Sequence, residues 1–265
     1  MSILHTEKHI KNEKSPWLVF IHGFGGSIKM WKRQIDSFKE KFNLFLIDLP
    51  GHGESKIGIS GENIRKFDKI ADIVVDTLRE NGIDKATFMC VSLGSLVFAG
   101  IFSKYPEIVD SAVLCGAVSG MNMVCRSLLG FVNKIKFALP YMVILKLFAY
   151  ILMPFKGHSK SREFFINSGK ILGRKEFMAW FTLFVNDINV LKDLTGLKDK
   201  ILFITGDEDF VFISGVKKKY QDLKDAKLKI LSHCGHVCNI QQWKEFNSIA
   251  LGYIENVYYT KSQTV

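Results

Sequence analysis

The sequence predicts an α/β fold in which a mostly parallel, doubly wound sheet carries an inserted helical segment. Short apolar runs alternate along the chain with stretches whose apolar residues recur at helical spacing, as a parallel sheet covered by helices requires. This alternation breaks down once, between about residues 119 and 190. We therefore expect a core formed by residues 1–118 and 191–265, with a helical cap over residues 119–190.

Six apolar runs are expected to be strands. Most are short and largely apolar, which is typical of strands buried on both faces of a sheet. The run Lys-Leu-Lys-Ile-Leu at residues 227–231 alternates instead, which favours a position near the sheet edge. The expected strands are residues 17–21, 43–47, 86–91, 111–115, 200–204 and 227–231.

Two segments of the core show clear helical patterns. One apolar stripe runs from Phe67 to Leu78 and stops at Gly82, a residue that readily takes the positive φ found just after a helix. The final helix is expected near the C-terminus. Its stripe consists of Trp243, Phe246, Ala250, Tyr253 and Val257.

Composition favours a single cytoplasmic enzyme domain. The 265 residues are 48% hydrophobic and 12% aromatic, which supplies a large core for one α/β domain with an insertion. The five cysteines have no disulfide-framework spacing, and their odd number favours a reducing compartment. Residues 1–8 lack the apolar segment of a signal peptide. The cysteines are Cys90, Cys115, Cys125, Cys234 and Cys238.

Ser92 stands in the sequence Cys-Val-Ser-Leu-Gly, directly after an apolar run and before a helix-like stretch. A serine hydroxyl needs a base to take its proton and must project from the backbone, which a sharp turn from strand to helix achieves. Small residues are needed two positions either side; Gly94 fits, whereas Cys90 replaces the usual glycine. Taken alone, such a serine is more often a helix N-cap.

Other motifs accompany Ser92 in a definite order. Upstream stand His-Gly-Phe-Gly-Gly-Ser at residues 22–27 and Asp-Leu-Pro-Gly-His-Gly-Glu-Ser at residues 48–55; downstream come Ile-Thr-Gly-Asp-Glu-Asp at residues 204–209 and then Gly235-His236. Together they resemble the α/β-hydrolase family, and a serine esterase or lipase with a helical cap in particular. In that family the nucleophile, the acid and the histidine follow in this order. The resemblance extends from about Trp17 to Tyr258.

The resemblance implies a catalytic triad. Ser92 would be the nucleophile, His236 its general base, and Asp209 the carboxylate that orients the histidine. Asp207 and Glu208 are adjacent acids, but the family spacing after the glycine selects Asp209. The backbone N–H groups of Phe24 and Leu93 would form the oxyanion hole. No cofactor and no metal is implied by this chemistry.

Other histidines and cysteines are given structural roles. His22 and His52 stand in motifs whose family role is to shape turns, so hydrogen bonding is expected of them rather than catalysis. The cluster His233, Cys234, His236 and Cys238 could be taken for a zinc site, but tetrahedral zinc normally draws ligands from two separated segments. No second Cys/His pair stands elsewhere to complete it, so zinc is not expected.

The cap contains a strongly apolar stretch between Pro140 and Pro154. Its thirteen residues, with Lys146 near the centre, would reach only about 20 Å as a helix, whereas a membrane span needs about 20 apolar residues. We expect a cap helix buried against the core. A lipid-facing or acyl-chain-lining surface is the alternative.

Positive charge is concentrated in the cap. Between Met121 and Val190, ten basic residues stand against three acids, which leaves most of the chain's net charge of +10 in this region. A basic surface attracts anionic partners: an acidic carrier protein, an anionic membrane surface, or a carboxylate-bearing substrate. A merely solvated basic face is the other interpretation. Nucleic acid is not expected, because no binding motif accompanies the charge.

The prediction for function is a serine hydrolase that cleaves a carboxylic ester with an apolar acyl or aromatic group through an acyl-enzyme intermediate. Several reactions use the same triad and stay open: a thioesterase or carrier-protein methyl esterase, a carbon–carbon bond hydrolase of the ring-cleavage-product type, and a proline-iminopeptidase-like aminopeptidase. A small-molecule ester is the expected substrate. A non-catalytic receptor with the same fold is the alternative from a different class.

Overall fold

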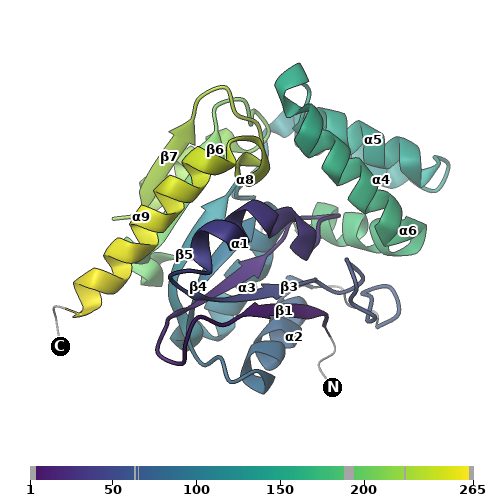
Figure 1. Cartoon of the computed structure of the whole chain (residues 1–265). Coiled ribbons are helices and arrows are strands. Elements are labelled where there is room, and N and C mark those ends of the chain that lie inside the picture. Colours follow the sequence, from purple (N-terminus) through teal and green to yellow (C-terminus); the bar gives the residue numbers. More distant parts are fainter. Residues whose placement is uncertain (1–3, 63, 65, 188–193, 224, 263–265) are drawn as a thin grey trace.

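The computed structural model describes residues 4–62, 64, 66–187, 194–223 and 225–262, and contains one sheet of seven strands (Figure 1). The strand order is β1-β3-β2-β4-β5-β6-β7, in which β1 is antiparallel to β3 and every other neighbouring pair is parallel. The strands are β1 (Thr6–His9), β2 (Trp17–Ile21), β3 (Asn43–Ile47), β4 (Ala86–Val91), β5 (Val109–Cys115), β6 (Ile201–Gly206) and β7 (Lys227–Leu231).

The six predicted strands are all present, and β7 lies at one edge of the sheet as its alternation predicted. The strand that sequence reasoning missed is β1. Its sequence Thr-Glu-Lys-His has no apolar residue, and its side chains are half-buried or exposed. An edge strand of this kind is held by backbone pairing with β3 rather than by burial, so it gives no hydrophobic signal.

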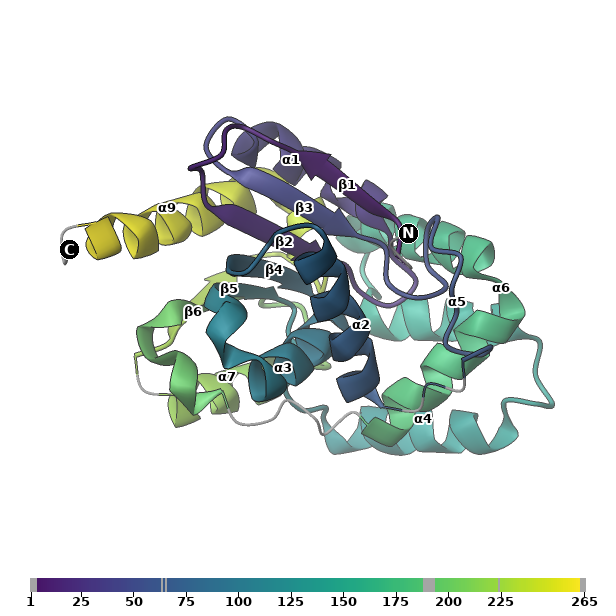
Figure 2. The ribbon, with the colours of Figure 1, turned by 90° about the horizontal axis from the view of Figure 1, so that it is seen from below.

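Helices cover both faces of the sheet, as a doubly wound fold requires (Figure 2). One layer contains α1 and α9, and the opposite layer contains α2, α3 and α7. The predicted stop at Gly82 is confirmed, since α2 ends at Glu80 and Gly82 has a φ of 70°. The body helices are α1 (Lys32–Phe38), α2 (Phe67–Glu80), α3 (Gly94–Lys104), α7 (Ile213–Asp222), α8 (Cys238–Gln241) and α9 (Trp243–Ser262).

The cap is helical and lies as a separate group beside the sheet (Figure 1). It consists of α4 (Met123–Ile135), α5 (Tyr141–Leu152) and α6 (Ser159–Asp187), where α6 is interrupted at Gly173 by a non-helical φ of 76°. Residues 188–190 of the predicted cap lie outside the described residues. In the part of the chain that is described, no helix combines the length and the apolar content needed to cross a membrane.

Polar contacts of two cap residues, Trp180 and Glu176, join the cap to the described part of the loop that follows β3. Trp180 of α6 donates its indole N–H to the carbonyl oxygen of Pro50 at 3.0 Å, and Trp180 is fully buried. Ser60 donates its hydroxyl to the carboxylate of Glu176. These contacts place the Asp-Leu-Pro-Gly-His-Gly loop directly against the cap, so the sequence motif shapes the boundary between the two parts.

Candidate active site

Ser92 occupies a strained turn between β4 and α3. Its φ of 51° lies in the left-handed region, which is uncommon for a residue other than glycine. The turn is held by a hydrogen bond from the Ser92 N–H to the carbonyl oxygen of Cys115 at 2.9 Å. A Cβ at Gly94 would lie 2.5 Å from the carbonyl oxygen of Ile21, so only glycine fits there. This geometry projects the serine side chain from the backbone, as a nucleophile elbow requires.

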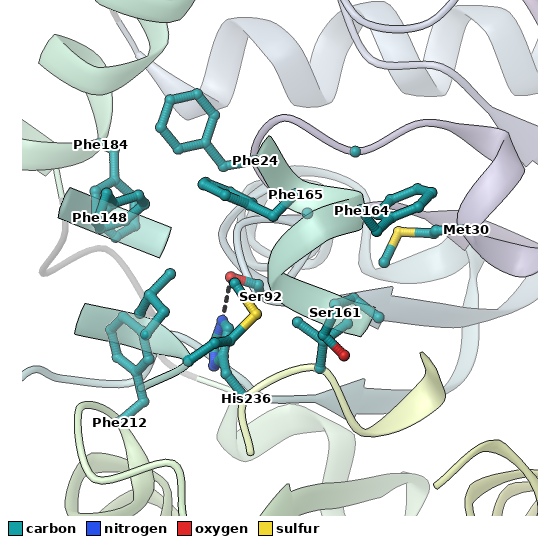
Figure 3. A pocket seen from close by; sticks show the side chains of 16 residues that line it. Phe24, Met30, Ser92, Phe148, Ser161, Phe164, Phe165, Phe184, Phe212 and His236 are labelled. Atoms are coloured by element: carbon teal, nitrogen blue, oxygen red, sulfur yellow. Dashed lines mark hydrogen bonds between the residues drawn. The ribbon is translucent and has the colours of Figure 1, made fainter. Parts of the chain in front are cut away.

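Ser92, His236 and Asp209 are brought together from three distant segments. Figure 3 shows the contact between Ser92 and His236. The Nε2 atom of His236 lies 2.7 Å from the hydroxyl oxygen of Ser92, and its Nδ1 atom lies 2.8 Å from Oδ2 of Asp209. Asp209 is fully buried and His236 almost so. An ionised carboxylate accepts only, so Nδ1 carries the proton, and Nε2 is left free to accept from the serine.

The structure separates Asp209 from its two acidic neighbours. Asp207 accepts a hydrogen bond from the Cys234 N–H at 3.2 Å, and Glu208 lies 2.7 Å from Nε2 of His158 in the cap. Asp209 also accepts from the Phe212 N–H at 3.4 Å through its other oxygen. The three adjacent carboxylates therefore point to three different partners, and Asp209 is the one at His236.

Phe24 follows the end of β2, and Leu93 follows Ser92 after the end of β4. Among the hydrogen bonds of the described residues, neither backbone N–H donates to another protein atom. Leu93 begins the first turn of α3, where such N–H groups have no partner within the helix. The Phe24 ring stacks on Phe177 of the cap at 5.1 Å between ring centres. Both N–H groups are thus without a partner among the described residues, and one belongs to a residue packed against the cap.

An apolar pocket opens on Ser92 between the body and the cap (Figure 3). Its polar side chains are Ser92, Ser161 and His236, and the residues that line it include no aspartate, glutamate, lysine or arginine. The free volume is only about 30 Å³, room for very few water molecules. The side chains around it are mainly aromatic or aliphatic: Phe24, Met30, Val91, Phe148, Leu152, Met153, Phe164, Phe165, Phe184, Phe212 and Val237.

A model of the alpha/beta hydrolase fold family matches residues 16–149, half of the chain. The chain belongs to this family. The matched segment contains Ser92 but ends before Asp209 and His236, so for this alpha/beta hydrolase the placement of those two residues comes from the structure.

Curated relatives of this alpha/beta hydrolase match over a limited part of their length. The 2-succinyl-6-hydroxy-2,4-cyclohexadiene-1-carboxylate synthase of Citrobacter koseri is 38% identical over 96 residues, which are 36% of this chain and 36% of that protein. The chain thus spans about a third of the length of this relative.

Solved structures match almost the whole chain at low identity. A carboxylesterase structure from Nitrososphaera gargenis has a TM-score of 0.77 at 19% identity, covering 97% of this chain and 96% of that one. The enol-lactonase of Burkholderia xenovorans LB400 has a TM-score of 0.74 at 16% identity, covering 95% and 96%. At these identities the likeness shows the fold alone.

His22 and His52 of this hydrolase shape turns, as predicted. Nδ1 of His22 donates to the Gly23 carbonyl oxygen at 2.8 Å, and its Nε2 accepts from the Leu49 N–H at 3.0 Å. Nδ1 of His52 likewise donates to the carbonyl oxygen of Pro50, and its Nε2 accepts from the Gly25 N–H. Burial lowers the pKa of His22, while burial and the neighbouring His22 lower that of His52 further. Both rings therefore act as neutral hydrogen-bonding bridges.

Because these two histidines are buried with lowered pKa values, we expect the free energy of unfolding to fall in acid. In the unfolded chain each has a pKa near 6.5, whereas the folded pKa is lower, so below about pH 6.5 the unfolded chain binds more protons. Each histidine can then lower the free energy of unfolding by up to about 1.4 kcal/mol per pH unit. Urea unfolding from pH 7 to pH 5 measures this slope. His52→Gln retains an oxygen to accept from Gly25 and should flatten the slope; an unchanged slope would contradict the assignment.

The cysteines are all free and buried. Burial raises the pKa of the Cys90 thiol, which occupies the place of the usual elbow glycine within β4. Hydrogen bonds with the thiols of Cys115 and Cys234, together with burial, raise the pKa of Cys238. The ring of His236 is engaged by Ser92 and Asp209, and the described residues contain no group of three or more His, Cys, Asp or Glu side chains arranged to hold a metal.

Sequence reasoning missed the contact between His158 and Glu208. His158 lies in a short 3-10 turn (Lys156–His158) of the cap and is fully buried. A Cβ at Gly235, the residue before His236, would lie 2.7 Å from the His158 ring, so this glycine lets the cap approach the histidine loop. The two partners are fifty positions apart and belong to no shared motif, so no local signal could have found them.

Proposed function

We propose that this protein is a serine hydrolase that cleaves a carboxylic ester with an apolar acyl or aromatic group. The observation that carries the proposal is the hydrogen-bonded series Ser92–His236–Asp209 at the floor of an uncharged, mostly apolar pocket. A lone serine at a strand-to-helix turn has many roles. A serine whose hydroxyl meets an imidazole that is itself oriented by a buried carboxylate has the arrangement of an activated nucleophile.

The geometry supports a two-step mechanism. Nε2 of His236 takes the hydroxyl proton as Oγ of Ser92 forms a bond to the carbonyl carbon, and the negative charge on the carbonyl oxygen is stabilised by the N–H groups of Phe24 and Leu93. His236 then returns the proton to the leaving alcohol, which gives the acyl-enzyme. A water molecule deprotonated by His236 attacks the acyl-enzyme, and the acid leaves as Ser92 regains its proton. Asp209 stays ionised and stabilises the imidazolium.

The pocket supports the choice of acyl group. Its aromatic and aliphatic walls favour an alkyl or aromatic acyl group, because burying each methylene contributes about 0.8 kcal/mol. Across p-nitrophenyl esters of increasing chain length, kcat/KM should therefore rise about fourfold for each methylene that the walls bury. Because the free volume is only about 30 Å³, the longer esters require the cap side chains to move outward. If the acetate were the best substrate, the apolar acyl assignment would be wrong.

A fluorophosphonate probe tests the chemistry separately from the substrate. Folded wild-type protein should be labelled on Ser92, whereas Ser92→Ala should not be labelled. Wild-type protein that remains unlabelled while folded would favour the alternative of a non-catalytic receptor. The same labelling would occur with a thioesterase, a carbon–carbon bond hydrolase or an aminopeptidase of this fold, so the ester series is compared with the matching thioesters and anilides.

The synthase relatives suggest a second candidate function, which rests on their sequence identity. By its name, the product of those enzymes bears carboxylate and succinyl groups. The pocket of this protein is lined by no lysine or arginine that could pair with them. We therefore favour the ester hydrolase. If the protein formed the product of those synthases faster than it hydrolysed any ester in the series, the synthase function would be favoured instead.

The five free cysteines support a reducing compartment, and we propose the cytoplasm as the site of action.

A further inference from the structure

Helix α4 exposes large apolar side chains along one face. Leu128 and Phe131 are exposed, and they continue a stripe that begins at Val124 with helical spacing. Met123 at the start of the helix and Phe137 just after its end are 83% and 78% exposed. The opposite face is buried in the cap through Cys125, Leu129 and Val132. Helix α4 is therefore apolar on its outer face as well as on its inner one.

Helix α5 repeats this arrangement. Val143, Leu147 and Tyr150 are exposed at the same four-and-three spacing, while Phe148 and Leu152 on the inner face line the pocket above Ser92. The prediction that this segment lies buried against the core is correct for one face only. A helix that is apolar on all sides is normally covered on all sides, so the outer face of α5 lacks a partner.

The exposed apolar residues are concentrated in the cap. Of the fourteen large apolar side chains that are exposed in the described residues, ten lie between Met123 and Ile171. Scattered exposed apolar residues need no explanation, but a concentration on one part of a molecule marks an interaction surface.

The charge of the same helices has one sign. The sequence contains no aspartate or glutamate from Ser111 to Arg162. Arg126 and Lys134 on α4 and Lys146 on α5 are exposed, and none of them forms an ion pair with a described acid. The fourth basic residue, Lys136, is different: it is buried, and its ammonium donates to Asn133 and Thr182. The outer faces of α4 and α5 are thus both apolar and cationic.

We propose that the outer faces of α4 and α5 dock on the surface of a membrane that contains anionic lipids. The large apolar side chains would enter the boundary between headgroups and acyl chains, and the unpaired cations would lie among the lipid phosphates. No helix of the described residues spans a bilayer, so the contact is peripheral. Because Phe148 and Leu152 on the inner face of α5 line the pocket, docking through its outer face would place this helix between the pocket and the bilayer.

Two observations favour lipid over an acidic carrier protein. A protein surface would meet the isolated cations with specific carboxylates, but here three cations are spaced among many more apolar side chains without forming a defined pocket. Aliphatic and aromatic side chains that are mostly exposed, such as Met123 and Phe137, can insert among the acyl chains of a lipid bilayer.

Vesicle co-sedimentation tests the proposal. Full-length protein should pellet with vesicles of phosphatidylcholine and phosphatidylglycerol in equal parts, and much less with phosphatidylcholine alone. Raising the salt concentration to about 1 M, where the Debye length is ~3 Å, should release part of the bound protein. The same binding is expected of Ser92→Ala, because docking does not depend on the proposed chemistry.

Matched variants distinguish binding through this surface from nonspecific hydrophobic binding. Leu128→Ser combined with Phe131→Ser, or Val143→Ser combined with Leu147→Ser, should weaken binding to the anionic vesicles about tenfold or more. Ile10→Ser combined with Ile230→Ser removes exposed apolar residues outside the cap and should change binding to the anionic vesicles little.

Two double charge-reversal variants test the cationic part of the same surface. Arg126→Glu combined with Lys134→Glu should weaken vesicle binding about tenfold or more, whereas Lys217→Glu combined with Lys218→Glu on α7 should have a much smaller effect. Unchanged circular dichroism and thermal midpoints establish that each variant is folded. The proposal is overturned if wild-type protein ignores the anionic vesicles, if it binds an acidic carrier protein but no vesicles, or if the control variants lose as much binding as the cap variants.

Discussion

Replacing Asp209 with asparagine is expected to lower kcat for ester hydrolysis by about ten-thousandfold, the size of effect seen when the orienting carboxylate of a triad is lost. An asparagine amide can donate to Nδ1 of His236, which would move the imidazole proton to Nε2. Nε2 lies 2.7 Å from the Ser92 hydroxyl and would then no longer accept its proton. The side chains have nearly the same shape, so the fold should be retained. Steady-state kinetics and circular dichroism measure the two quantities.

The neighbouring acids provide matched controls for this prediction. Asp207→Asn removes charge beside the Cys234 N–H, and Glu208→Gln removes it beside His158, but neither residue contacts His236. Both variants should lose less than about tenfold in kcat, because the imidazole keeps its orientation. If Asp207→Asn or Glu208→Gln were the more damaging change, the acid of the triad would have been assigned to the wrong residue.

The sheet could be predicted from the sequence because burial leaves a pattern in it. β4 consists of six fully or almost fully buried residues, of which only Thr87 is polar, and a strand buried on both faces is a near-continuous apolar run. β1 could not be predicted, since its Thr-Glu-Lys-His sequence is held at the sheet edge by backbone hydrogen bonds to β3. Sequence patterns report the environment of side chains, and backbone pairing at an edge leaves no trace in them.

The candidate site likewise contains residues that could be predicted from the sequence and residues that could not. Ser92, Asp209 and His236 each stand in a short motif that follows a strand, and the resemblance of these motifs and their order to the α/β-hydrolase family allowed them to be named. His158 and the orphaned hydroxyl of Ser161 come from the cap. Their positions depend on how the cap packs on the body, which no local pattern encodes. The cap was predicted as a helical region, but which of its faces are exposed could be learned only from the structure.

The loop that carries His236 packs on the strand that precedes Asp209, and a single glycine permits this. Gly206 ends β6 and pairs with Leu231 of β7. A Cβ at position 206 would lie 1.9 Å from the carbonyl oxygen of Cys234 and 2.5 Å from that of Gly235. Both are backbone atoms, so no change of rotamer relieves the overlap, and the histidine loop must move away from the strand.

Gly206→Ala is therefore expected to lower the free energy of unfolding by about 3 kcal/mol and to reduce kcat as His236 is drawn away from Asp209. Gly252→Ala in α9 is the matched control: a Cβ there meets nothing within 4 Å, and alanine should stabilise the helix by up to about 1 kcal/mol. Urea unfolding gives both values. The two substitutions add the same methyl group. If they change the free energy of unfolding in opposite directions, the loss at Gly206 is due to the close approach of the histidine loop. Equal changes would show that the loop moves aside freely.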